Sequence, residues 1–187
     1  MSENVCKDEE PVNPFFLQGK ALVRHFERQD ALLEFHRLFN LEYQNDRASV
    51  IVAGAFLDTL LEHMLVNFLV DDEKEVKRLL DPDQPLGSYG NRVRAVYCLG
   101  LINKVVRDDL RLVGQIRNRF AHDLYTTFED EKVCSWCLAL KWYRVAYTEP
   151  PPGVSAKDLF CVDVNQIAGC LDGLASAVRG DKRTIRK

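Results

Sequence analysis

Residues 50–70 are the most apolar stretch of the chain, and the helix predicted around them, 47–70, constrains the fold more than any other segment. Apolar residues lie nearly all round the helix that this segment predicts, so one buried stripe cannot account for them. A helix of this kind needs neighbours on several sides. The segment is long enough to cross a membrane, but Asp58, Glu62 and His63 interrupt it. The sequence therefore predicts a central core helix, and we expect no membrane partner.

Other segments show apolar residues at helical spacing, and no alternation persists long enough for a β-sheet. The chain is therefore predicted to be all-α, a single-domain bundle of about seven to eight helices. The predicted helical segments are 15–39, broken or divided around Gln29 and Asp30; 47–70, capped by Asp46; 71–80; the segment after Ser88, with Gly100 inside it; the segment from about Asp108 to His122; 132–147; and the segment that follows a Ser155–Asp158 cap.

The length and composition fit one domain, because 187 residues of which 47% are apolar can bury a substantial core. We expect a flexible leader at 1–13, a single helical domain at 14–180 and a basic tail at 181–187. The first ten residues are polar and acidic, which is unlike a secretory signal. We therefore predict a cytoplasmic protein whose six cysteines stay reduced.

Cys134 and Cys137 have the spacing of a redox pair or of half a zinc site. A zinc site needs two more ligands, and the sequence has no second CxxC and no HxxxH. A thioredoxin-like motif needs a strand–helix context, which is not predicted here. The sequence also lacks GxGxxG, Walker, GxSxG and HExxH motifs. We expect structural cysteines, no metal site and no cofactor.

Asp58 and Glu62 lie four residues apart and so share one face of the central helix. A buried carboxylate needs a cationic or hydrogen-bonding partner, because an unpaired charge in a core is very costly. Residues 92–119 hold seven arginines and lysines against two aspartates, which makes the arginines after position 90 candidate partners. We predict a structural ion network of Asp58, Glu62 and Arg117.

Arg117, Asn118 and His122 lie at the end of a predicted helix and could also carry chemistry. A guanidinium can hold a phosphate, an amide can orient it, and an imidazole can move a proton near neutral pH. These are suitable parts for cleaving an RNA backbone. In a regular helix, however, Arg117 and His122 point roughly 140° apart. They reach one target only if the helix ends between them or a second subunit completes the site.

The spacing of Arg117 and His122 resembles the R-x4-6-H signature of HEPN domains, all-α modules found in many ribonuclease toxins and nucleotide-binding proteins. A longer resemblance, over roughly residues 30–125, is to the bacterial mannitol operon repressor family. This resemblance implies an all-helical regulator without a recognisable DNA-binding domain, which acts through association with other proteins. The segments that carry it are Arg47-Ala48-Ser49, Leu57–Glu62, Pro85–Tyr89 with Arg92, Tyr97–Ile102, Asp109-Leu110 and Ile116–His122.

Two functions follow as hypotheses. The favoured one is a transcriptional regulator of the mannitol operon repressor family, not an enzyme, that acts through protein–protein association. The alternative is a metal-independent HEPN-type ribonuclease, or a nucleotide-binding module, that uses Arg117, Asn118 and His122. The sequence shows no recognition helix with exposed base-reading side chains, so the favoured regulator would contact nucleic acid only indirectly. A homodimer that buries the motif at a two-fold axis is expected in both cases.

Overall fold

The computed structural model describes residues 30–35, 37, 39, 45–145, 149–150 and 152–185. The described residues form helices and no strand, which confirms the prediction of an all-α fold. The leader at 1–13, most of the segment at 15–39 and the last two residues of the basic tail lie outside the described residues. The elements are α2 (Asp46–Phe68), α3 (Glu73–Leu80), α4 (Tyr89–Cys98), α5 (Lys104–His122), α6 (Glu131–Ala139), the 3-10 helix η3 (Trp142–Val145), α7 (Ala156–Ala177) and the 3-10 helix η4 (Val178–Asp181).

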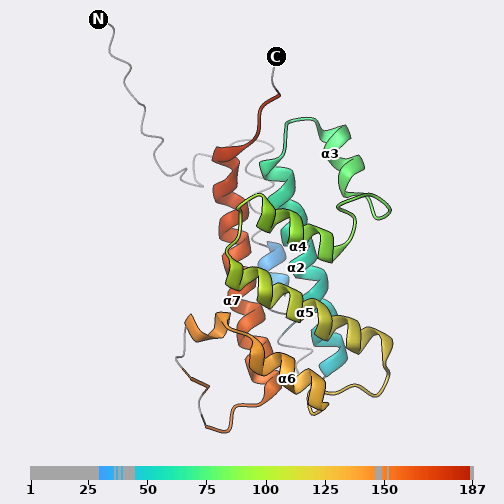
Figure 1. The fold of residues 1–187 in the computed structure, drawn as a ribbon, viewed down its shortest axis with the longest axis vertical. Coiled ribbons are helices and arrows are strands. Elements are labelled where there is room, and N and C mark those ends of the chain that lie inside the picture. The colour runs from blue at the N-terminus through green and yellow to red at the C-terminus, as the bar shows by residue number, and fades with distance from the viewer. Residues whose placement is uncertain are drawn as a thin grey trace, which may run out of the picture.

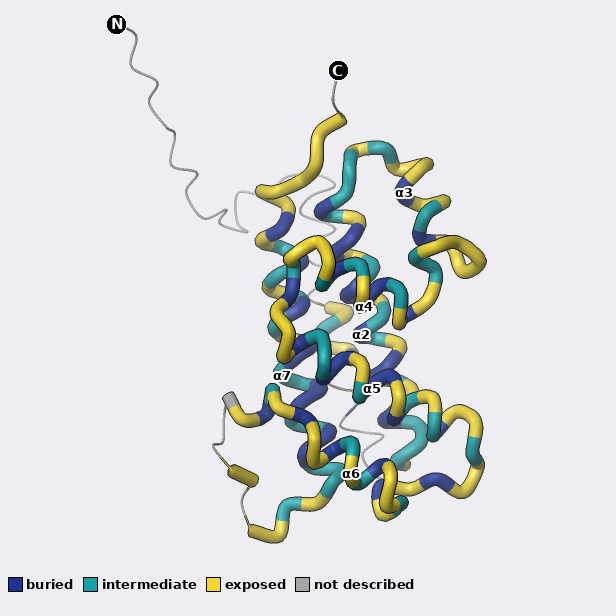
Figure 2. The backbone as a smooth tube through the Cα atoms, viewed as in Figure 1, coloured by how far each residue is buried: buried dark blue, intermediate teal, exposed yellow. Residues whose placement is uncertain are grey.

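Helix α2 is the central helix of the bundle, as its all-round apolar pattern predicts. It packs against α4, α5 and α7, whereas α3 stands apart at one end (Figure 1). By length and composition α2 could cross a membrane, but half of its most apolar window is buried inside the protein. The inward faces of α2, α5 and α7 are buried together (Figure 2). The helix is capped by Asn45 and not by Asp46, which instead pairs with Lys157 on α7.

Helix α4 begins at its predicted cap, since the side chain of Ser88 accepts a hydrogen bond from the backbone N–H of Asn91. It ends earlier than predicted. Gly100 lies outside the helix with φ of 76°, where its N–H donates to the carbonyl of Tyr97 and the next N–H donates to Val96. This is a Schellman ending, and glycine adopts its left-handed backbone without a steric penalty. Gly100 thus terminates the helix.

The predicted helix at 132–147 is two elements, because two buried aspartate side chains interrupt it. Asp109 accepts hydrogen bonds from the backbone N–H groups of Lys141 and Trp142, and Asp163 accepts one from Tyr143. These N–H groups therefore have side-chain partners from α5 and α7, where a continuous helix would use its own carbonyls. As a result, α6 stops at Ala139 and η3 follows.

Helix α7 starts with the predicted capping box. The Ser155 side chain accepts from the backbone N–H of Asp158, and the Asp158 carboxylate accepts from the backbone N–H of Ser155. One apolar face of the helix is directed to the core and packs against α2 and α6. Its buried members are Phe160, Val164, Ile167, Leu171 and Val178.

Candidate functional site

Arg92 is the cation that holds the acidic pair of α2. Its guanidinium pairs with Asp58 at 2.9 Å and with Glu62 at 3.0 Å, and it also donates to the backbone carbonyls of Leu86 and Leu80. Only 7% of Arg92 is exposed. An arginine after position 90 therefore meets the two carboxylates, but it is Arg92 and not the predicted Arg117.

Arg117 instead packs between α2 and α4. Its guanidinium carbon lies 5.7 Å from the centre of the Tyr89 ring, and no carboxylate of the described residues lies within ion-pair distance. A Cβ at Gly54 would lie only 2.7 Å from Cγ of Arg117, so this glycine makes room for the arginine stem. The Nε atom of Arg117 is buried and has no hydrogen-bond partner among the described residues. Because Arg92 is already paired with Asp58 and Glu62, Arg117 makes a cation–π contact with the Tyr89 ring instead.

Tyr89 fills the space beside Gly114, and this contact gives a stability prediction. The Tyr89 hydroxyl donates to the carbonyl of Leu110, and burial raises the pKa of Tyr89. A Cβ at Gly114 would lie 2.9 Å from the Tyr89 ring. We expect Gly114→Ala to lower the free energy of unfolding by about 1–2 kcal/mol, because overpacking outweighs the better helix propensity of alanine. Urea denaturation measures this change.

The matched control is Gly90→Ala in α4, where a Cβ would meet no atom within 4 Å. This variant should be neutral or up to about 1 kcal/mol more stable, since only helix propensity changes. Equal effects of the two substitutions would contradict the proposed crowding at Tyr89.

The predicted ribonuclease residues do not converge within one subunit. Helix α5 continues without a break to His122, so Arg117 and His122 point roughly 140° apart. Asn118 and His122 are exposed, whereas Arg117 is half-buried against Tyr89. This arrangement gives the HEPN-type alternative no support.

Arg47, for which the sequence predicted no contact, fixes the end of α5. Its guanidinium donates to three backbone carbonyls, those of Phe120, Asp123 and Leu124. These are carbonyls at and just beyond the helix C-terminus, which need external donors. Arg119 pairs with Asp123 and with Asp130 and ties the same turn to the start of α6.

The turn at 123–126 holds two apolar side chains in solvent. Leu124 is 75% exposed and Tyr125 is 88% exposed, more than any other large apolar residue that the structure describes. The backbone N–H of Tyr125 donates to the Asp123 carboxylate, and the backbone N–H of Thr126 donates to the Asp123 carbonyl. Arg47 also donates a hydrogen bond to the Leu124 carbonyl, so hydrogen bonds from Arg47 and to Asp123 both hold the backbone of the turn. A rigid turn with exposed leucine and tyrosine is a candidate protein-binding surface.

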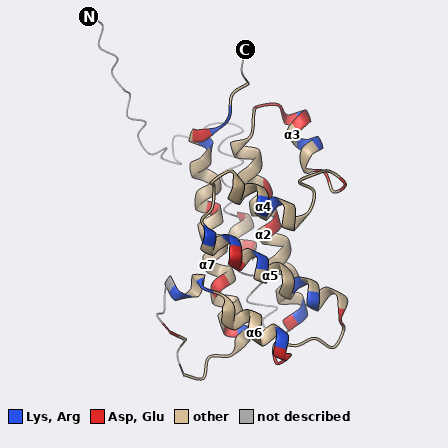
Figure 3. Cartoon of the chain, in the orientation of Figure 1, with Lys and Arg blue, Asp and Glu red and all other residues tan. Residues whose placement is uncertain are grey.

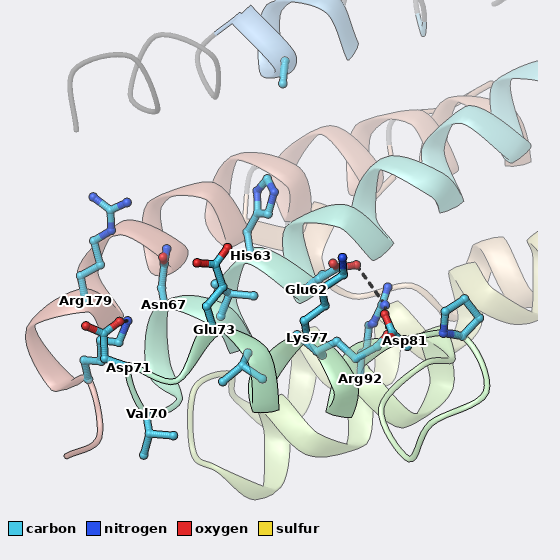
Figure 4. A pocket seen from close by; sticks show the side chains of 16 residues that line it. Glu62, His63, Asn67, Val70, Asp71, Glu73, Lys77, Asp81, Arg92 and Arg179 are labelled. Atoms are coloured by element: carbon cyan, nitrogen blue, oxygen red, sulfur yellow. Dashed lines mark hydrogen bonds and ion pairs between the residues drawn. The ribbon is translucent and has the colours of Figure 1, made fainter. Parts of the chain in front are cut away.

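A groove of about 700 Å³ lies between α2 and α3. Figure 4 shows Glu62, Lys77 and Arg92 at one end and Asn67, Asp71 and Arg179 at the other. Part of its charge is matched, since Glu62 pairs with Arg92 and Asp71 pairs with Lys182. No nucleophile with an adjacent base stands out among the lining residues, so the groove has no evident catalytic arrangement.

Cys134 and Cys137 are free thiols on α6. Burial raises the pKa of Cys137 to about 12, which keeps it protonated and unreactive at neutral pH. Among the described residues no group of three or more histidine, cysteine or acidic side chains could hold a metal ion. Cys137 is thus part of the buried core, whereas Cys134 is half-buried.

Comparisons with known proteins give a family resemblance and a fold. No family profile matches the sequence. The mannitol operon repressors of Escherichia coli strain K12 and of strain O6:H1 are each 29% identical to this chain over 117 residues, which is 60% of this chain and 59% of the relative. The match thus spans about three fifths of the curated relatives. The predicted resemblance to the mannitol operon repressor family is confirmed.

A solved structure, the X-ray structure of the MtlR-HPr complex from Escherichia coli, contains a chain with the same fold. That chain superposes on this one with a TM-score of 0.53 at 23% identity. The match covers 78% of this chain and 98% of that chain. At this identity the likeness establishes the helical fold.

Proposed function

We propose that this chain is a bacterial transcriptional regulator of the mannitol operon repressor type, which acts in the cytoplasm by binding other proteins. Its relatives are named as repressors of the mannitol operon, and the structure with the same fold is of a complex with the protein HPr. Self-association as a homodimer and indirect contact with nucleic acid are further parts of this proposal.

The observation that carries the proposal is the fixed turn at 123–126. Tyrosine is among the residues that dominate binding energy in protein interfaces. Because Arg47 and Asp123 already hold the backbone of the turn, little conformational entropy would be lost when a partner covers Leu124 and Tyr125. An exposed apolar pair on a flexible loop would bind less well. We assign this turn as the contact surface for an HPr-type partner.

The proposal is tested by titrating the purified protein with HPr from the same organism in a calorimeter. We expect binding, and we expect Tyr125→Ala to weaken it by about tenfold or more, since central aromatic contacts are typical hot spots. Ile185→Ala is the matched control, because Ile185 is 68% exposed and lies far along the chain. The affinity of the Ile185→Ala variant for HPr should equal that of the wild type.

Both variants should keep the thermal unfolding midpoint of the wild type, because both side chains are exposed. Absence of HPr binding by the wild-type protein would refute the choice of partner. Binding that Tyr125→Ala leaves unchanged would refute the choice of surface.

A further inference from the structure

A second hollow lies between α5 and the end of α6, away from the turn at 123–126. It measures about 290 Å³. The residues that line it include Asp108, Arg111 and Gln115 of α5, Ala139 at the end of α6, and Lys141 between α6 and η3. Arg111, Gln115 and Lys141 are exposed. Figure 3 shows basic residues along α5 and in η3 beside it.

The two carboxylates of this hollow are already engaged. Asp108 accepts two hydrogen bonds from Arg107, at 2.9 and 2.6 Å. Asp109 is buried and accepts from the backbone N–H groups of Lys141 and Trp142. Each carboxylate therefore has its donors within the protein, and neither needs a cation from outside.

The two cations that line the hollow, by contrast, have no acidic partner in the described part of the chain. Among the described residues no carboxylate lies within ion-pair distance of Arg111 or of Lys141. The hollow thus presents two exposed positive charges beside Asp108, which is paired with Arg107, and Asp109, which is buried and held by backbone N–H groups, although the whole chain carries a net charge of −3. Such a local excess of positive charge attracts an anionic partner.

An apolar side chain lines the same hollow, and another is exposed close to it in sequence. Leu112 lines it and is half-buried, and Leu138, next in sequence to the lining residue Ala139, is an exposed leucine at the end of α6 (53% exposed). A nucleic-acid backbone would need a longer row of unpaired cations and would gain little from an exposed leucine. A protein segment that carries both carboxylates and apolar side chains matches both features.

We propose that the hollow between α5 and α6 binds an acidic, leucine-containing segment of a partner protein. The carboxylates of the segment pair with Arg111 and Lys141, and its apolar side chains cover Leu112 and Leu138. Gln115 supplies an amide that can bond to the backbone of the segment. This surface is separate from the turn at 123–126, so the inference goes beyond the proposed contact with HPr.

The test uses fluorescence anisotropy with a labelled peptide of repeated Glu-Glu-Leu-Leu and the full-length protein. We expect binding that weakens as salt is added, because the pairing charges are exposed. The double variant R111E/K141E should weaken binding by about tenfold or more, since attraction becomes repulsion at both positions. Leu138→Ser should weaken it as well.

Three controls make the result decisive. Lys74→Glu reverses an exposed lysine on α3 and should leave the affinity unchanged. A peptide with glutamine in place of glutamate should bind much more weakly than the acidic peptide. Equal binding of the two peptides, or an acidic peptide that binds R111E/K141E as well as it binds the wild type, would overturn the proposal. Tighter binding of a DNA or RNA oligonucleotide at the same residues would also overturn it.

The outcome is independent of the HPr titration, because the two experiments use different ligands and different variants. R111E/K141E should still bind HPr, and Tyr125→Ala should still bind the acidic peptide. Loss of HPr binding in R111E/K141E would instead place both partners on one surface and contradict the second site.

Discussion

Arg92→Met is expected to lower the free energy of unfolding by about 2–4 kcal/mol, because it leaves buried and half-buried polar groups without their donors. Methionine keeps much of the volume but none of the donors. It leaves Asp58 and Glu62 without their cation and leaves the carbonyls of Leu80 and Leu86 without the guanidinium. The effect stays below that of a fully buried ion pair, because the two carboxylate side chains are 32% and 44% exposed.

The matched control is Arg94→Met, which replaces an exposed arginine two residues along the same helix. It should change stability by less than about 0.5 kcal/mol, as surface substitutions usually do. Urea denaturation followed by circular dichroism measures both variants. Equal stability of the two would show that Arg92 is not the link between α2, α3 and α4.

Removal of Arg92 should also loosen α3, which hydrogen exchange would detect as faster exchange at residues 76–80.

The fold could be predicted from the sequence wherever the signal is local. The apolar run of α2 specifies a central helix, and Ser88 and Ser155 each mark a helix start with a side chain that accepts a nearby backbone N–H. The break after α6 could not be predicted in this way. It depends on Asp109 and Asp163, which come from two distant helices and meet the chain only in the folded state.

In the candidate site, too, local sequence features could be predicted, but contacts between distant residues could not. The spacing of Asp58 and Glu62 correctly indicated carboxylates that need an arginine after position 90, but several arginines fit that description. Only the packing of α4 against α2 selects Arg92. Arg47 was missed because its acceptors are backbone carbonyls some 73 to 77 residues away, which leave no mark in the sequence. The exposure of Tyr125 is likewise a result of tertiary structure.

Asp163 makes the stability of the protein depend on pH. Its carboxyl group is fully buried on α7, where one oxygen accepts from the Tyr143 N–H and the other has no hydrogen-bond partner among the residues that the structure describes. Burial, together with the nearby charge of Asp109, raises the pKa of Asp163 from 3.8 to about 8. The folded protein thus keeps a proton on Asp163 at neutral pH, whereas the unfolded chain releases it above about pH 4. Since the unfolded state binds fewer protons between these values, the free energy of unfolding falls as pH rises from about 4 to about 8.

Asp163→Asn should remove this pH dependence. Asparagine keeps an oxygen for the Tyr143 N–H but cannot ionise, so we expect the variant to be more stable than the wild type at pH 8 by a few kcal/mol, and by up to about 5 if the whole pKa shift is expressed. Near pH 4.5 the two proteins should be similar, or the variant slightly weaker because its amide N–H₂ group is buried. Urea denaturation at intervals from pH 4.5 to 8.5 measures the difference. Asp83→Asn, at an exposed aspartate in the turn after α3, should keep the slope of the wild type. If the stability of the wild type instead rises with pH relative to that of Asp163→Asn, the carboxyl group is ionised in the folded protein. The Tyr143 N–H would then donate to a charged carboxylate.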